Sequence, residues 1–140
     1  MNKKSIHKLS SPAEESSAIL GISSHENDYR LSWALNEFIG FHLVKSENHV
    51  VFNPKINEEQ EFSVYTYTDD DDILHRLISN RCDNGFLLEE FKNIDFILTI
   101  QPVNNNSNLS EMVARIKLIP FVAAVFPINS VQAKAKKRGL

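Results

Sequence analysis

Residues 28–40 read DYRLSWALNEFIG, and this stretch gives the clearest helix signal in the chain. Four apolar side chains recur at the spacing that places them on one face of an α-helix, namely Leu31, Leu35, Phe38 and Ile39. Gly40 follows them at the position where a left-handed residue commonly ends a helix. A short apolar run at 18–23 precedes the helix. The sequence therefore predicts a strand followed by an amphipathic helix.

Strand patterns dominate the middle of the chain. Residues 62–68 (FSVYTYT) are β-branched and aromatic and alternate, which predicts a strand with one buried face. Residues 73–80 fit a helix or a strand. The pair Asn84-Gly85 is a hairpin signal and favours the strand. A further apolar strand is expected over 94–101.

The last third of the chain predicts a helix and a strand. Asn108, with Glu111 three residues on, is expected to begin a helix that Pro120 ends. The wholly apolar run 121–128 reads as a strand central to its sheet. Together the elements predict an α+β fold, a two-layer sandwich of an antiparallel meander sheet and two helices, partly ferredoxin-like in strand and helix order.

Composition indicates one domain. The chain has 140 residues, 42% of them hydrophobic, and residues 13–132 are expected to form a single α+β domain. One cysteine, Cys82, allows no internal disulfide, which fits a reducing compartment. The first residues lack the apolar core of a signal peptide, and the apolar run at 118–128 is too short to cross a membrane. We therefore expect a cytoplasmic protein with no membrane partner.

The net charge of −3 conceals an uneven distribution. Residues 1–12 carry three lysines and no acid, and the residues between the two ends carry 18 acidic and eight basic side chains. Residues 133–140 carry four basic side chains and no acid, namely Lys134, Lys136, Lys137 and Arg138. We expect both ends to be flexible basic tails that either keep the termini soluble or contact phosphate groups, as in RNA.

Recognisable catalytic motifs do not emerge from the sequence. The four glycines lie at least 19 residues apart, so they form no glycine-rich phosphate loop. His25-Glu26 begins like a zinc-binding His-Glu-x-x-His helix, but Tyr29 occupies the place of the second histidine. The sequence places no histidine base against Cys82. We therefore expect no cofactor, no metal and no enzymatic activity.

Six polar residues lack an obvious local role in the sequence: Arg30, Asn36, Asn80, Arg81, Glu90 and Asp95. One interpretation is structural, with Asp95 paired to Arg81 or Arg30 and Asn80 closing the Asn-Gly turn by bonding to backbone. The other is a shared groove for a peptide or nucleotide. Trp33 likewise has two interpretations, as a core residue or as part of an exposed aromatic patch with Tyr65 and Tyr67.

Several segments resemble the small bacterial IPExxxVDY family, in the family's order: 22–25, 28–36 (DYRLSWALN), 77–81 (LISNR) and 88–96 (LEEFKNIDF). In the signature itself Glu90 and Asp95 match, whereas Leu88, Glu89, Ile94 and Phe96 depart from it. The resemblance implies no assigned activity. Our leading hypothesis is a non-enzymatic interaction or regulatory domain acting through a protein partner or self-association. An RNA-associated accessory protein and a small-metabolite sensor are the alternatives.

Overall fold

The computed structural model describes residues 17–103 and 108–140, apart from the side chain of Lys136. Its main sheet contains β1 (Ala18–Ser24), β2 (Val44–Asn53), β3 (Glu58–Thr68), β4 (Leu74–Ser79), β7 (Phe96–Gln101) and β8 (Val122–Pro127). Every neighbouring pair is antiparallel, and the strand order is β2-β3-β4-β7-β1-β8. Residues 1–12, predicted to be a basic tail, lie outside the described residues.

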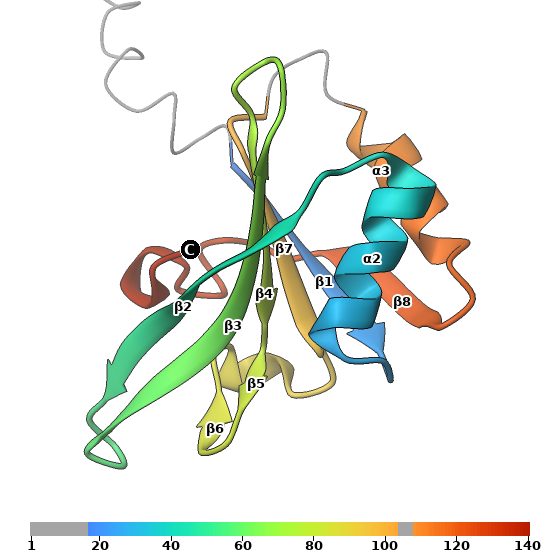
Figure 1. The fold of residues 1–140 in the computed structure, drawn as a ribbon. Coiled ribbons are helices and arrows are strands. Elements are labelled where there is room, and N and C mark those ends of the chain that lie inside the picture. Colours follow the sequence, from blue (N-terminus) through green and yellow to red (C-terminus); the bar gives the residue numbers. More distant parts are fainter. Residues whose placement is uncertain (1–16, 104–107) are drawn as a thin grey trace, which may run out of the picture.

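Two α-helices cover one face of this sheet, α2 (Asp28–Ile39) and α3 (Leu109–Lys117). Figure 1 shows both on the same side, with the C-terminal segment on the other. An antiparallel sheet packed against helices confirms the predicted α+β class. The strand preference for residues 73–80 is confirmed by β4.

The caps of α2 explain its length. Asn27 precedes the helix, and its Oδ1 accepts a hydrogen bond from Arg30 N at 2.8 Å. Gly40 ends the helix at φ 91°, and its N–H donates to Leu35 O. One part of the prediction is wrong: Phe38, expected on the buried face, is exposed. The buried residues are instead Leu31, Ser32, Ala34 and Leu35.

The helix α3 begins as predicted. Asn108 Oδ1 accepts from Glu111 N at 3.2 Å, and Asn108 Nδ2 donates to Glu111 Oε1 at 2.8 Å. The strand β8 differs from its prediction, because it lies at the edge of the sheet beside β1. It is apolar because Val122 and Val125 pack into the core under the helices while Phe126 packs against the opposite face.

Two hydrophobic cores occupy the two faces of the sheet. The core beneath the helices includes Leu20, Ile22, Leu98 and Ile100. The core on the opposite face includes Ile19, Phe62, Val64, Ile78 and Ile97. Since successive residues of a strand point to opposite faces, the central strand β7 supplies both cores and is almost wholly buried.

The Asn-Gly hairpin is present but differs from the predicted one. It consists of β5 (Arg81–Cys82) and β6 (Gly85–Phe86), with Asp83 and Asn84 at its tip and Gly85 at φ 150°. These two short strands form a separate sheet, because β4 pairs with β3 and β7 instead of returning along 86–88. A 3₁₀ turn over Glu89–Phe91 then leads the chain back to β7.

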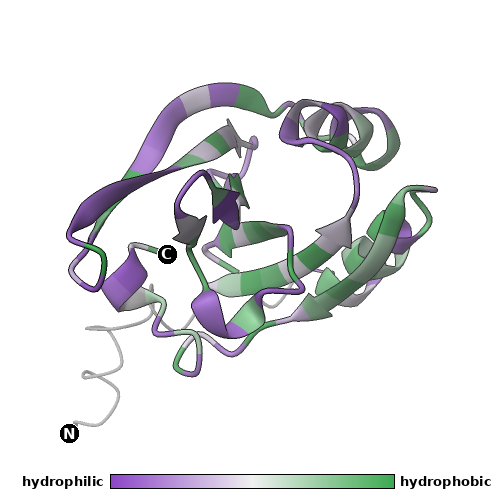
Figure 2. Ribbon diagram, turned by 90° about the horizontal axis from the view of Figure 1, so that it is seen from below, coloured by the Kyte–Doolittle hydropathy of each residue, from purple (hydrophilic) through white to green (hydrophobic). Residues whose placement is uncertain are grey.

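The C-terminal segment differs most from the sequence prediction. Residues 133–140 were expected to be a flexible tail, but Ala133 and Ala135 are buried in the core on the face opposite the helices. His49 Nε2 lies 2.7 Å from Arg138 O, which ties the segment to β2. Figure 2 shows the C-terminus beside the hydrophilic β2–β3 hairpin, away from the two helices. The segment therefore covers the second face of the sheet.

Candidate functional site

The six polar residues singled out in the sequence fall into two groups in the structure. Arg30 and Asn36 lie on α2. The other four, Asn80, Arg81, Glu90 and Asp95, lie in the segment that connects β4 to β7. Asn36 is bonded to backbone: its Oδ1 accepts from Leu43 N at 2.8 Å and its Nδ2 donates to Leu43 O at 3.1 Å. The guanidinium of Arg30 lies over the ring of Phe121, 5.4 Å from its centroid.

Asn80 is fully buried and organises the chain after β4. Its Nδ2 donates to Phe91 O at 3.1 Å and to Ile94 O at 2.9 Å. Its Oδ1 accepts from Leu88 N at 2.7 Å. The asparagine side chain thus bonds to backbone groups of residues 88–94 and closes this loop. The structural interpretation expected it to close the Asn-Gly turn instead.

Asp95 connects three segments. Its Oδ1 accepts from Arg81 Nε at 2.9 Å, and its Oδ2 accepts from Ser24 N at 2.8 Å. Arg81 also donates to Lys92 O at 3.2 Å and stacks on Phe86 with its guanidinium 5.1 Å from the ring centroid. The structure therefore shows the Asp95–Arg81 pairing that the structural interpretation anticipated.

Glu90 pairs with the C-terminal segment. Arg138 donates from both terminal nitrogens to its two carboxylate oxygens at 2.8 and 3.1 Å. The bonds from Arg138, helped by the charge of Lys134, lower the pKa of Glu90 to about 2. All six polar residues thus have partners within the protein, and Glu90 and Asp95, the two residues that match the family signature, form structural ion pairs.

The basic residues near the C-terminus are also placed. Lys134 and Lys137 are exposed, and Arg138 is held by Glu90. The side chain of Lys136, predicted as a further phosphate contact, lies outside the described part of the chain. Lys134 has φ 53°, a left-handed conformation that is uncommon for a residue with a side chain.

A surface of large apolar side chains covers the outer side of the helices. Its members, which we call the aromatic face, are Tyr29 (69% exposed), Trp33 (46%), Phe38 (51%) and Leu118 (80%). Trp33 and Phe38 touch edge to face with ring centroids 6.3 Å apart. Tyr29 and Trp33 are four residues apart and so neighbour each other on α2.

Both helices build this aromatic face. A hollow of about 170 Å³ lies between Phe38 of α2 and Leu118 beyond α3, with Arg115, Ile119 and Pro120 around it. Arg115 Nη2 donates to Phe38 O at 2.8 Å and so holds the ends of the helices together. Trp33 is exposed, but its neighbours are not those expected. Tyr65 is buried in the helix-side core, and Tyr67 stacks on His75 at 5.1 Å.

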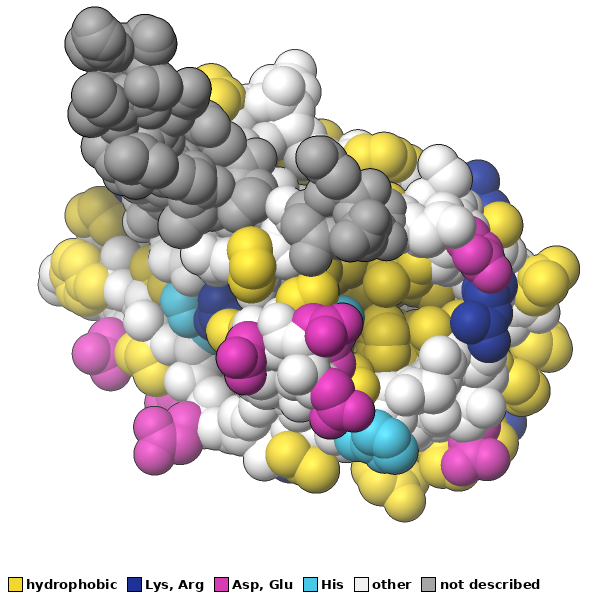
Figure 3. All heavy atoms as spheres, turned by 90° about the horizontal axis from the view of Figure 1, so that it is seen from above, with side chains coloured by type: hydrophobic (Ala, Val, Ile, Leu, Met, Phe, Trp, Pro, Cys, Tyr) yellow, Lys and Arg dark blue, Asp and Glu magenta, His cyan; other side chains and the backbone are white. Residues whose placement is uncertain are grey.

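A second hollow, of about 330 Å³, opens at the end of the molecule seen in Figure 3, where acidic side chains border an apolar floor. Phe41, Tyr67 and His75 form a ring cluster there, with Asp69 and Glu111 among the lining residues. His75 is 4% exposed, and its Nδ1 has no hydrogen-bond partner among the described residues. Burial lowers the pKa of His75.

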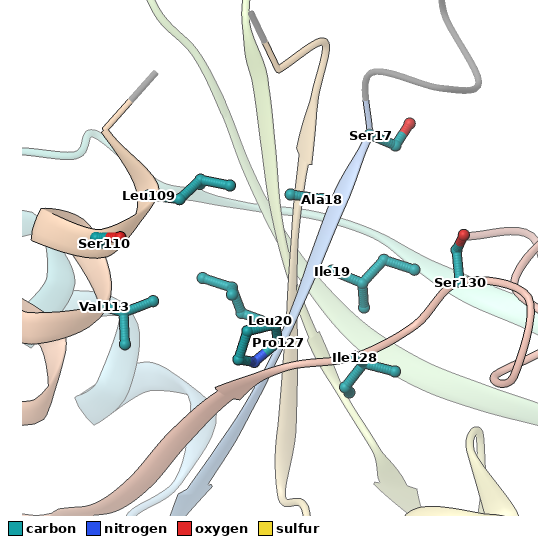
Figure 4. Close-up of a pocket in the computed structure, with 10 residues that line it drawn as sticks. All are labelled: Ser17, Ala18, Ile19, Leu20, Leu109, Ser110, Val113, Pro127, Ile128 and Ser130. Atoms are coloured by element: carbon teal, nitrogen blue, oxygen red, sulfur yellow. The ribbon is translucent and has the colours of Figure 1, made fainter. Parts of the chain in front are cut away.

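A third cavity, of about 400 Å³, lies beside the first residues of β1. Figure 4 shows Leu109, Ser110 and Val113 of α3 facing Ala18, Leu20 and Pro127 of the sheet. The described residues of its lining are apolar apart from serine hydroxyls, so among them no titratable side chain is offered for acid-base chemistry or for binding an ion.

The described part of the chain contains neither a metal centre nor a membrane-spanning helix. No group of three or more histidine, cysteine, aspartate or glutamate side chains within the described residues has the arrangement of a metal centre. No helix among those residues is long and apolar enough to cross a membrane. The thiol of Cys82 lies 3.1 Å from Asn84 Oδ1 in the β5–β6 hairpin.

Comparison of the chain with family models, curated proteins and solved structures finds no match. The resemblance to the IPExxxVDY family therefore stays a prediction that rests on the quoted segments. The class that the structure itself defines is an α+β domain with an exposed aromatic face on its helical layer.

Proposed function

We propose that this protein is a non-enzymatic interaction domain and that it binds a protein partner through the aromatic face. The observation that carries the proposal is the exposure of Tyr29, Trp33, Phe38 and Leu118 on one side of the helical layer. Neighbouring large apolar side chains are costly to leave in water, and tryptophan and tyrosine are enriched among the residues that dominate interface energetics.

The geometry of the face suits an anchor from a partner. The hollow between Phe38 and Leu118 has room for one apolar side chain, since its volume is about 170 Å³. The bond from Arg115 to Phe38 O joins α2 and α3, so the surface is already formed before binding. A partner that presents an apolar side chain between aromatic neighbours fits this arrangement.

Paired variants test the proposal. Tyr29→Ala/Trp33→Ala removes two anchors from the aromatic face, and Val44→Ala/Val131→Ala removes two apolar side chains that are comparably exposed elsewhere. Each tagged protein is recovered from the native cell extract after light crosslinking, and bound proteins are quantified by mass spectrometry. We expect the wild type and the control pair to recover one partner protein in a molar ratio near one to one. The aromatic pair should recover at least tenfold less of that partner.

Two outcomes contradict the proposal. Equal recovery of every bound protein by both variant pairs would exclude the aromatic face as the binding surface. The second outcome is that the wild type dimerises in sedimentation analysis and that only the aromatic pair loses the dimer. The partner would then be a second copy of the chain and not a different protein.

A further inference from the structure

A basic cleft lies on the side of the molecule away from the helices. It has a volume of about 230 Å³ and is enclosed by the β2–β3 turn, by β6 and by the C-terminal segment. Its charged lining residues are Lys55, Glu89, Lys134, Lys137 and Arg138. The fold creates this cleft, because the C-terminal segment is more than 70 residues beyond the turn in sequence and is brought there by the burial of its alanines.

The charges around the cleft are positive in excess. Lys55 Nζ lies 3.4 Å from Glu89 Oε1, so the acid in the lining is already paired. Arg138 is likewise paired with Glu90. Lys134 and Lys137 are both exposed and form no salt bridge within the described residues, although the charge of Lys134 also acts on Glu90. A chain with net charge −3 thus concentrates cations at one concave place, where they attract anions most strongly.

The backbone at Lys134 adds a second observation. Its φ of 53° is unusual for a residue other than glycine, and such conformations occur often at functional sites. The turn is held by Lys134 N donating to Val131 O at 3.0 Å and by Arg138 N donating to Lys134 O at 3.2 Å. The C-terminal segment therefore holds Lys134 in one fixed turn at the cleft.

Two aromatic residues, Phe52 and Phe86, also line the cleft. Phe52 is 54% exposed on the edge strand β2, whereas Phe86 in β6 is only partly exposed and has the guanidinium of Arg81 over its ring. An exposed ring beside lysines, as Phe52 provides, is the combination on which proteins stack nucleobases while lysines bind the phosphates. The volume fits a phosphate with part of an adjacent ring better than it fits a whole drug-sized ligand.

We propose that this cleft binds a phosphate ester that carries a planar base, with Lys134 and Lys137 on the phosphate and Phe52 against the base. This site is separate from the aromatic face, and the proposal does not depend on a protein partner. The same chemistry is offered by a free mononucleotide and by a nucleotide within single-stranded RNA, and the experiment distinguishes these two sources.

The experiment measures binding of three probes to the full chain in 50 mM salt. The probes are inorganic phosphate, uridine monophosphate and a fluorescent single-stranded oligouridylate. The test variant is Lys134→Gln/Lys137→Gln, and the control is Lys45→Gln/Lys117→Gln, which removes the same charge from lysines that do not line the cleft. A third variant, Phe52→Ala, removes the ring alone.

We expect the test variant to bind the base-bearing probe at least tenfold more weakly, and the control to stay within twofold of the wild type. For the oligouridylate, the slope of log K against log salt should become shallower by about 1.4, since each phosphate contact on a single strand contributes about 0.7. Phe52→Ala should weaken the base-bearing probes and leave inorganic phosphate unchanged. Binding of the mononucleotide identifies a free nucleotide as the ligand, and binding of the oligomer alone identifies RNA.

Three results would overturn the proposal. The first is no binding of any probe by the wild type, and the second is an equal loss in the test and control variants, which would indicate only a general charge effect. The third is that Phe52→Ala and Lys134→Gln/Lys137→Gln, measured separately, both bind the base-bearing probes as tightly as the wild type. Circular dichroism of each variant confirms that a loss of binding does not come from unfolding.

Discussion

Replacing Asn80 by alanine should destabilise the protein more than any surface substitution. The side chain is fully buried, and it satisfies three backbone groups: Leu88 N, Phe91 O and Ile94 O. Asn80→Ala leaves Leu88 N and Ile94 O without these bonds, whereas Phe91 O still accepts from Ile94 N at 3.0 Å. At about 1 kcal/mol for each of these two orphaned groups, the loss is about 2 kcal/mol, with a smaller contribution from the vacated volume. Small domains have a stability of roughly 5 to 15 kcal/mol, so the change is large.

Urea unfolding followed by circular dichroism measures this loss. Asn93→Ala is the matched control, because Asn93 is an exposed asparagine of the same loop and its backbone bond to Ser23 remains. The control should change stability by less than about 0.5 kcal/mol. Hydrogen exchange adds a local measurement, since the Leu88 amide should lose protection in Asn80→Ala. A loss below about 1 kcal/mol, with the Leu88 amide still protected, would refute the argument that Asn80 closes the loop.

Two further predictions concern the buried histidine and the C-terminus. Burial lowers the pKa of His75 below its ordinary value, so the unfolded chain binds protons more readily, and stability should fall as pH drops below about 6.5. His75→Phe should flatten urea midpoints measured between pH 7.5 and 5.5, and an unchanged pH dependence would contradict this cause. Deleting residues 133–140 removes the buried Ala133 and Ala135 and the packing of Leu140, and should cost about 2 kcal/mol or more. A deletion variant as stable as the full chain in urea would show instead that the segment is the loose tail predicted from the sequence.

Local signals predicted much of the fold. The helical spacing and Gly40 predicted α2, because a left-handed glycine leaves few alternatives to a helix end. Asn108 and Glu111 predicted the start of α3 through a cap that needs no distant residue. The Asn-Gly signal downstream favours a strand over 73–80, and β4 is a strand, although the hairpin itself forms between β5 and β6. Each of these predictions depends on residues that are close in sequence.

Predictions that depend on distant contacts were less accurate. The run 121–128 is apolar on both faces, which indicates burial of the faces but not the strand's place in the sheet, and β8 lies at an edge. The C-terminal segment looks like a solvated tail because of its lysines. Its alternate alanines, Ala133 and Ala135, were the available signal that one side of it packs against the sheet.

The candidate sites could be predicted only in part from the sequence. The Arg81–Asp95 pair was anticipated as one alternative, and the lysines near the C-terminus were singled out for phosphate. That these C-terminal lysines lie beside Phe52 and Lys55 was not predictable, because it requires the return of the chain across the sheet. The aromatic face was missed in part because helical spacing places Phe38 with the buried residues, whereas the structure leaves it 51% exposed.

Site-specific photocrosslinking tests the proposed function most directly. A photoreactive phenylalanine derivative replaces Trp33 in the centre of the aromatic face, and in a control protein it replaces Val131, which is exposed away from that face. If the protein is an interaction domain, we expect position 33 to give a discrete protein adduct in cells. Position 131 should not give this adduct, and adding Tyr29→Ala/Phe38→Ala should reduce it. If position 33 gives no protein adduct, or the same adducts as position 131, the aromatic face is not the binding surface of this protein.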